Sequence, residues 1–280
     1  MHCVLTLCFH RYYDPRFSKW GSLRVINEDR VEPYEGWVQC LSPPPGHYSL
    51  HLALVLTLTV NSKSSATLST ANSNSEEPSL FHFLQSLTVD LSSRDSMGNV
   101  EVLKRGDLQL TSAGTGIRHS EKTYGSSPVH FLQIWSLPQG SGLAPKYFTR
   151  HFTDAEKTDR LVTIVAPVGS EGASEEREGD GPAPVQSPLY LYATLLSKGA
   201  SVTHKLRHSD ISPGQRKAYV HVIQTSGYNT GKAKGNRVLL NSGLELAEGD
   251  GAFAIGEGGQ PIEIKNVGDN TAEVLLFDLD

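Results

Sequence analysis

The sequence predicts an all-β protein built from two similar β-barrel domains. From Val100 onward, short segments rich in Val, Ile, Leu, Tyr and Phe alternate with Gly, Pro, Ser and Asp, as at 161–167 and 273–279. No segment keeps a 3.6-residue apolar period over the length of a helix, so helices should be few. Short strands at this spacing are typical of a sandwich or a barrel.

An internal repeat predicts the number of domains. Residues 105–110 (Arg-Gly-Asp-Leu-Gln-Leu) recur at 248–253 (Glu-Gly-Asp-Gly-Ala-Phe), an offset of 143, and in both copies an apolar closing strand begins 23 residues after the glycine, at Val129 and Ala272. One Gly-Asp pair can recur by chance, but the shared spacing to a strand indicates duplication. The predicted domains are therefore 9–137 and 145–280, with a Gly- and Pro-rich linker between them.

Bulk properties exclude several classes of protein. With 280 residues the chain can hold a core in each of two domains, and its net charge of -5 gives no reason to expect a direct nucleic-acid partner. Three cysteines, all within the first 40 residues, argue against a disulfide framework. The start lacks the basic region of a signal peptide, and the apolar run 50–60 is too short to span a bilayer as a helix. We expect a cytoplasmic protein, with a nuclear location left open and no membrane partner.

Two stretches differ from their surroundings. Residues 169–184 are acidic and Gly-rich, which predicts a disordered surface loop within the second domain. Residues 38–90 are crowded with Ser and Thr, carry few charges and have little turn chemistry. We expect this atypical insert to be disordered and to leave the first barrel disrupted, with unpaired strand edges.

The motif His119-Ser120-Glu121 is the candidate site. Residues i and i+2 of a strand share a face, so His119 and Glu121 should project together, and an imidazole beside a carboxylate can bind a divalent transition metal. A hydrogen-bonded surface pair is the alternative. The repeat favours the metal, because the counterparts of these two residues are Ile262 and Ile264, which indicates a face that points into each barrel. His130, at the start of a strand, is a candidate for lining the first barrel.

Several sequence blocks resemble the pirin family, in particular its quercetin-dioxygenase-like branch. The resemblance covers about residues 9–36 and 93–280, and the closing strands 129–135 and 275–279 agree with it. The blocks are Tyr-Tyr-Asp-Pro-Arg-Phe at 12–17, Gly-Ser-Leu-Arg-Val-Ile-Asn-Glu-Asp at 21–29, Arg-Asp-Ser-Met-Gly-Asn at 94–99 and Ser-Ala-Gly-Thr-Gly-Ile-Arg-His-Ser-Glu at 112–121. The resemblance implies tandem cupin domains of the RmlC-like jelly-roll type, the second of the quercetinase C-terminal kind, with Fe(II) or another divalent transition metal in the first.

The resemblance also implies a metal held by a His-x-His pair together with the His and Glu of a His-Ser-Glu motif. His119 and Glu121 match the second pair, and Glu121 is the candidate catalytic residue. The His-x-His pair should fall within the atypical insert, which contains none. His47 and His51 are four residues apart, about 13 Å along a strand, and His82 is isolated, so none of the three is expected to replace the missing ligands.

Three hypotheses follow. The chain is a relative of Fe(II)-dependent quercetin 2,3-dioxygenases that acts on a flavonol-like aromatic substrate, with weak or no activity because two of four ligands are absent. Alternatively, it is a non-enzymatic binding module or transcriptional cofactor with a protein partner. The third hypothesis concerns residues 37–89, whose composition is also that expected of a retained intron or a frame error in the gene model.

Overall fold

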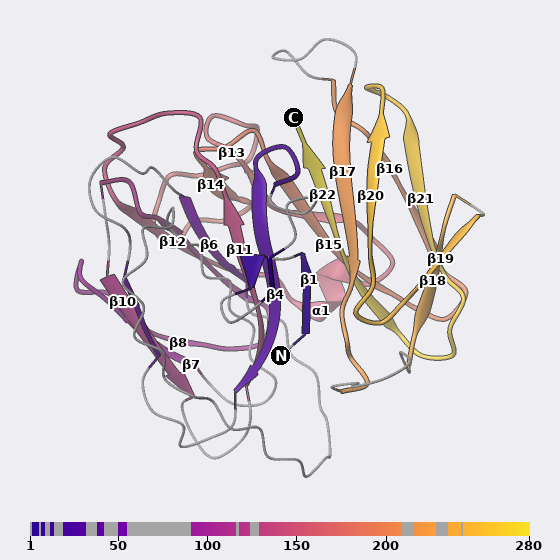
Figure 1. Cartoon of the computed structure of the whole chain (residues 1–280), viewed down its shortest axis with the longest axis horizontal. Coiled ribbons are helices and arrows are strands. Elements are labelled where there is room, and N and C mark those ends of the chain that lie inside the picture. The colour runs from indigo at the N-terminus through magenta and orange to yellow at the C-terminus, as the bar shows by residue number, and fades with distance from the viewer. Residues whose placement is uncertain are drawn as a thin grey trace.

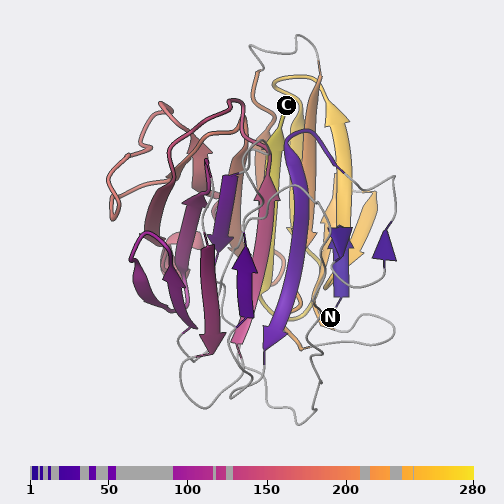
Figure 2. The same cartoon turned by 60° about the vertical axis from the view of Figure 1, so that its left-hand side comes forward.

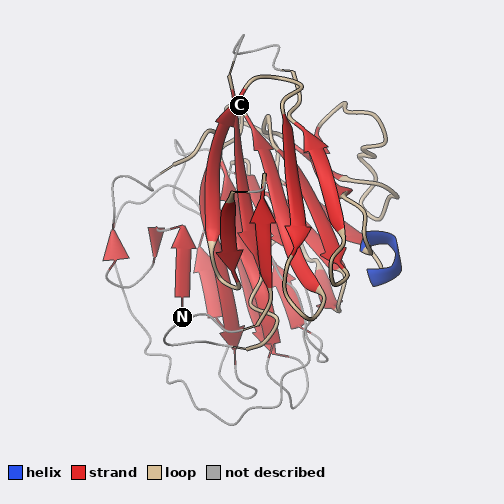
Figure 3. Ribbon diagram, turned by 90° about the vertical axis from the view of Figure 1, so that its right-hand side faces the viewer, coloured by secondary structure: helices blue, strands red, loops and turns tan. Residues whose placement is uncertain are grey.

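The computed structural model describes residues 2–5, 7–8, 12–13, 19–31, 38–41, 50–54, 91–115, 118–123, 129–208, 215–227, 235–241 and 243–280. Across these ranges the regular structure is almost entirely strand, and α1 (Asp154–Lys157) is a single turn of helix (Figure 3). Within the same ranges, no helix is long and apolar enough to cross a bilayer. The all-β prediction is confirmed.

The first domain is made of two sheets, and its N-terminal ribbon pairs β2 (Leu7–Cys8) with β3 (Tyr12–Tyr13). A six-stranded sheet has the order β1 (His2–Leu5), β4 (Leu23–Val31), β11 (Val129–Ser136), β6 (Leu50–Leu54), β9 (Asp107–Ser112) and β12 (Lys146–His151). A four-stranded sheet has the order β5 (Val38–Leu41), β10 (Arg118–Thr123), β7 (Leu91–Asp95) and β8 (Val100–Leu103).

The second domain repeats this plan and lies beside the first in Figures 1 and 2. Its six-stranded sheet has the order β14 (Ala183–Val185), β13 (Val162–Pro167), β15 (Tyr190–Leu196), β22 (Ala272–Leu279), β17 (Arg216–Val222) and β20 (Gly251–Gly256). Its four-stranded sheet has the order β16 (Ser201–Lys205), β21 (Pro261–Asn266), β18 (Arg237–Leu240) and β19 (Leu244–Ala247).

The internal repeat appears in the topology. The order β4-β11-β6-β9 in the first domain matches β15-β22-β17-β20 in the second, and β5-β10-β7-β8 matches β16-β21-β18-β19. Strands β10 and β21 have bounds that differ by the 143-residue offset, and so do β11 and β22. The prediction of two similar β-barrels is therefore confirmed, and each residue of these strands has a defined counterpart in the other domain.

Two strands come from the atypical insert, where we expected disorder. β5 pairs with β10, and β6 lies between β11 and β9. Both occupy the positions that β16 and β17 hold in the second domain, so the sheets of the first domain have the same strand order as those of the second. Their neighbours offer backbone donors and acceptors that need partners, and this favours strand pairing even in a segment of unusual composition. Residues 42–49 and 55–90 of the insert lie outside the described ranges.

The acidic loop, predicted to be disordered, packs onto the first domain. The buried Arg150 of β12 donates from Nη1 to the carbonyl oxygen of Arg177 at 3.0 Å and from Nη2 to that of Ser174 at 2.6 Å. Thr149 N donates to the same Arg177 oxygen at 2.8 Å, and the Arg177 side chain pairs with Glu101 of β8. A buried arginine with two carbonyl acceptors orders the loop, and composition alone does not reveal that partner.

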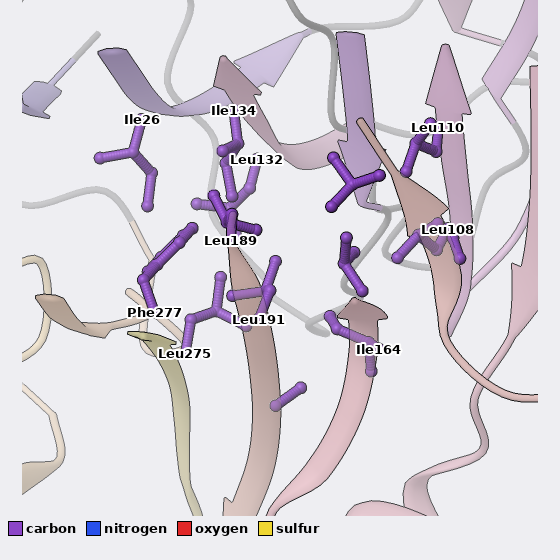
Figure 4. Packing of buried hydrophobic residues seen from close by; sticks show 14 of the residues in the cluster. Ile26, Leu108, Leu110, Leu132, Ile134, Ile164, Leu189, Leu191, Leu275 and Phe277 are labelled. Carbon is purple, nitrogen blue, oxygen red and sulfur yellow. The ribbon is translucent and has the colours of Figure 1, made fainter. Parts of the chain in front are cut away.

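The largest core lies between the two six-stranded sheets (Figure 4). Residues of β4, β9 and β11 on one side meet residues of β13, β15 and β22 on the other. Strand β22 is buried on both faces, because Leu275 and Phe277 belong to this shared core whereas Val274 and Leu276 belong to a separate core inside the second domain. Each such side chain stabilises the fold by about 1.5–3 kcal/mol, so the two domains form one hydrophobic unit.

Candidate functional site

Strand β10 carries the two residues that the sequence predicts as metal ligands, His119 and Glu121. It lies between β5 and β7 in the four-stranded sheet (Figure 1). On the β5 side, Cys40 lies opposite His119 and Val38 lies opposite Glu121. The side chains of these four residues lie outside the part of the chain that the structure describes, so the predicted site is defined by backbone register.

On the β7 side, Asp95 lies opposite His119 and Ser93 lies opposite Glu121. The Asp95 carboxylate is occupied by its own turn, where Oδ1 accepts from the backbone N–H groups of Met97 and Asn99, both at 2.9 Å. Ser93 is buried. None of the four residues opposite the predicted ligands, on either neighbouring strand, is a histidine.

The histidines of the insert are placed as follows. His51 belongs to β6 in the other sheet of the domain, where it pairs in register with Thr111 and Trp135. His47 and His82 lie outside the described residues. Within the ranges that the structure describes, no three His, Cys, Asp or Glu side chains are arranged to hold a metal ion.

A buried polar cluster at the domain interface was not predicted. Glu28 of β4 accepts from Nε2 of His130 at 2.7 Å and from Nε2 of His221 at 3.1 Å, and its Oε1 also accepts from the backbone N–H of Gln224 at 2.9 Å. His130 comes from β11 in the first domain, whereas His221 and Gln224 come from the second. All three side chains of the Glu28–His130–His221 cluster are at least 97% shielded from solvent. His130 therefore faces the other domain rather than lining the first barrel.

The electrostatics of this cluster follow from its burial. Burial by itself raises the pKa of Glu28, but the hydrogen bonds from the two imidazoles outweigh it, and the pKa lies well below the ordinary 4.5. Burial lowers the pKa of His130, which favours the neutral ring. Among the described residues, the Nδ1 atoms of both histidines have no hydrogen-bond partner. The arrangement is a carboxylate held by two imidazole donors, and its role is to join the domains.

The sequence held a weak signal for this cluster. The counterpart of His130 in the repeat is Glu273, so a polar residue stands at the same position of an otherwise apolar strand in both copies. Glu273 is buried as well, and its nearest charge is Arg105, with Nη1 3.6 Å from Oε2. A polar position kept in both closing strands indicates a buried partner, but the sequence does not say which residue supplies it.

The fold and the placement of the His-Ser-Glu strand define the chain as a tandem cupin. A family model described as Pirin matches residues 87–136, which include β10 and β11. Quercetin 2,3-dioxygenase of Escherichia coli K12 is 31% identical over 275 residues, covering 98% of this chain and 89% of that protein. A putative quercetin 2,3-dioxygenase of Pasteurella multocida is 30% identical over 272 residues, covering 97% and 88%.

Solved structures agree with this. The chain resembles YhhW from Escherichia coli with a TM-score of 0.66 and 28% identity, over 97% of this chain and 87% of that one. A second structure of YhhW, described as a bacterial pirin in complex with nickel(II), matches with a TM-score of 0.64. The chain belongs to the pirin family, and its relatives include quercetin 2,3-dioxygenases.

Proposed function

We propose that this chain is a pirin-type bicupin whose first barrel keeps only part of a metal centre, with His119 and Glu121 as its remaining protein ligands. Activity as a dioxygenase toward a flavonol-like substrate is then weak or absent. The observation that supports this is the register of the sheet, because Val38 and Cys40 stand opposite the two ligands where a His-x-His pair would complete the set.

The donor set does not fit a resident metal. When bound in the family, a divalent transition metal supplies Lewis-acid and redox chemistry beside the substrate. A common mononuclear iron site uses two histidines and one carboxylate, with further positions open. His119 and Glu121 supply one of each, so one or two ligands are lacking. Glu121 is proposed as the catalytic residue on the basis of the family motif alone.

The experiment restores the missing ligands. The double variant Val38→His/Cys40→His places a His-x-His pair on β5 opposite the two residues. Metal content is measured by mass spectrometry after purification from iron-supplemented medium, and quercetin turnover is followed by oxygen uptake. We expect the parent to hold well below one ion per chain, and the variant to hold about one ion and to gain turnover.

A matched control carries the same two histidines elsewhere in the sheet. Val100 and Val102 lie on β8, exposed and two strands away from β10. Val100→His/Val102→His should bind no more metal than the parent. A parent that already holds one ion per chain and oxidises quercetin contradicts the proposal, as does a folded Val38→His/Cys40→His variant that gains neither metal nor turnover. A metal-free parent that recovers a specific protein partner in a pull-down supports the alternative of a binding module.

A further inference from the structure

A second polar cluster lies inside one end of the second barrel. Its centre is Asp278 of β22, which is fully buried. Oδ1 accepts from Nε and Nη2 of Arg216 at 2.9 and 2.7 Å. Oδ2 accepts from Nε2 of His204 at 2.7 Å and from the backbone N–H of Arg207 at 2.8 Å. Both oxygens of the carboxylate are therefore saturated, and the guanidinium of Arg207 is not among the groups they hold.

The guanidinium of Arg207 is the cation that this cluster leaves unneutralised. Its Cζ lies 3.9 Å from the centre of the Tyr190 ring, and Nη1 donates to the hydroxyl of Tyr192 at 3.4 Å. Among the described residues, no carboxylate forms an ion pair with it, and the residue is exposed. Burial raises the pKa of Tyr192, so its hydroxyl stays neutral. One carboxylate thus faces two guanidinium groups, and the cluster has a net positive charge.

The position of this cluster in the barrel corresponds to the site proposed for the first domain. His204 of β16 pairs in register with Ile262 of β21. Ile262 is the counterpart of His119, and β16 takes the place of β5 in the matching sheet order. This correspondence rests on the proposed function, whereas the excess of positive charge does not.

We propose that Arg207 and His204 form a metal-free binding site for a small aromatic carboxylate at this end of the second barrel. A guanidinium presents paired N–H donors whose geometry matches the two oxygens of a carboxylate. His204 makes one printed hydrogen bond, through Nε2, so the other ring nitrogen remains for a ligand. The rings of Tyr190 and Tyr192, with centres 6.5 Å apart and 17° between their planes, provide aromatic surface beside the charge.

The test is a calorimetric titration of the full chain with benzoate at low salt, in the presence of EDTA. We expect a dissociation constant on the order of 0.1–1 mM and about a tenfold weakening in Arg207→Gln. The matched control is Arg237→Gln, an exposed arginine of the same domain that pairs with Glu245 on β19, and it should bind benzoate as the parent does. Benzyl alcohol, the neutral analogue, should not bind measurably.

Three outcomes overturn the proposal. These are no benzoate binding at 10 times the expected constant, equal binding by Arg207→Gln and the parent, or equal binding of benzyl alcohol. Inorganic phosphate that binds as tightly as benzoate also overturns the assignment to a carboxylate. If Arg207→Gln does not fold, Arg207→Lys keeps the charge without the paired donors and should weaken binding by a smaller factor. Because EDTA is present throughout, failure here leaves the metal centre of the first barrel unaffected.

Discussion

Replacing Glu28 by Gln should weaken the contact between the two domains. The substitution keeps the shape of the side chain and removes its charge. The carboxylate accepts three hydrogen bonds, from His130, His221 and the backbone of Gln224, and the last two cross between the domains. An amide has one acceptor oxygen, so its NH₂ group must face one of the imidazole donors.

The expected loss follows from these bonds. A hydrogen bond to a charged group contributes about 1.5–3 kcal/mol, and a buried donor left unsatisfied costs about 1–3 kcal/mol. With one bond replaced by the amide oxygen, Glu28→Gln should lower the free energy of unfolding by about 2–4 kcal/mol. For a chain of this size that lowers the melting temperature by roughly 4–8 °C.

The assay is thermal and urea unfolding followed by circular dichroism at pH 7.5. The matched control is Glu245→Gln, which removes an exposed carboxylate that pairs with Arg237 and should cost about 0–1 kcal/mol. Loss of contact between the domains can also split the transition in two, because two-state behaviour is not assured in a two-domain chain. A Glu28→Gln protein that unfolds as one step within 1 °C of Glu245→Gln refutes the reasoning.

Two further predictions use the same cluster and the repeat. Burial lowers the pKa of His130 below the ordinary 6.5, so below that pH the unfolded chain binds a proton that the folded chain does not; stability should fall as the pH drops from 6.5 toward 4.5, and His130→Gln should flatten this slope in unfolding curves. Gly106 and Gly249 are counterparts with φ of +83° and +85°, but an added Cβ would lie 2.4 Å from the backbone oxygen of Phe152 in the first case and 3.1 Å from the Gln224 side chain in the second. Gly249→Ala should cost about 1–2 kcal/mol and Gly106→Ala at least about 1 kcal/mol more; the reverse order of melting temperatures would contradict this.

The repeat is the part of the fold that the sequence predicted well. The Gly-Asp turns and the apolar closing strands are local patterns, and the offset between the copies of β10 and β11 is the one the structure has. Strands β5 and β6 could not be predicted in the same way. Their own composition has few strand and turn signals, and β5 pairs with a strand that begins more than 70 residues later.

The polar clusters lay beyond prediction for a related reason. Glu28 lies 102 residues from His130 and 193 from His221, and Asp278 lies 62 residues from Arg216 and 74 from His204. No motif links residues at such separations. What a sequence can reveal is an isolated polar residue within an apolar strand, which must find a partner because an unpaired buried charge is costly.

The backbone of a sheet and the chemistry of its side chains can be lost separately. Strand β5 satisfies the backbone groups of β10 whatever side chains it carries, so Val38 and Cys40 can stand opposite Glu121 and His119 without breaking the sheet. Under the proposed function, the chain keeps the pirin fold while lacking ligands, since the shared core and the Glu28 cluster that stabilise it lie on the opposite face of the domain from β5 and β10. Membership of the family therefore establishes the fold, and the activity depends on the residues at two positions of one strand.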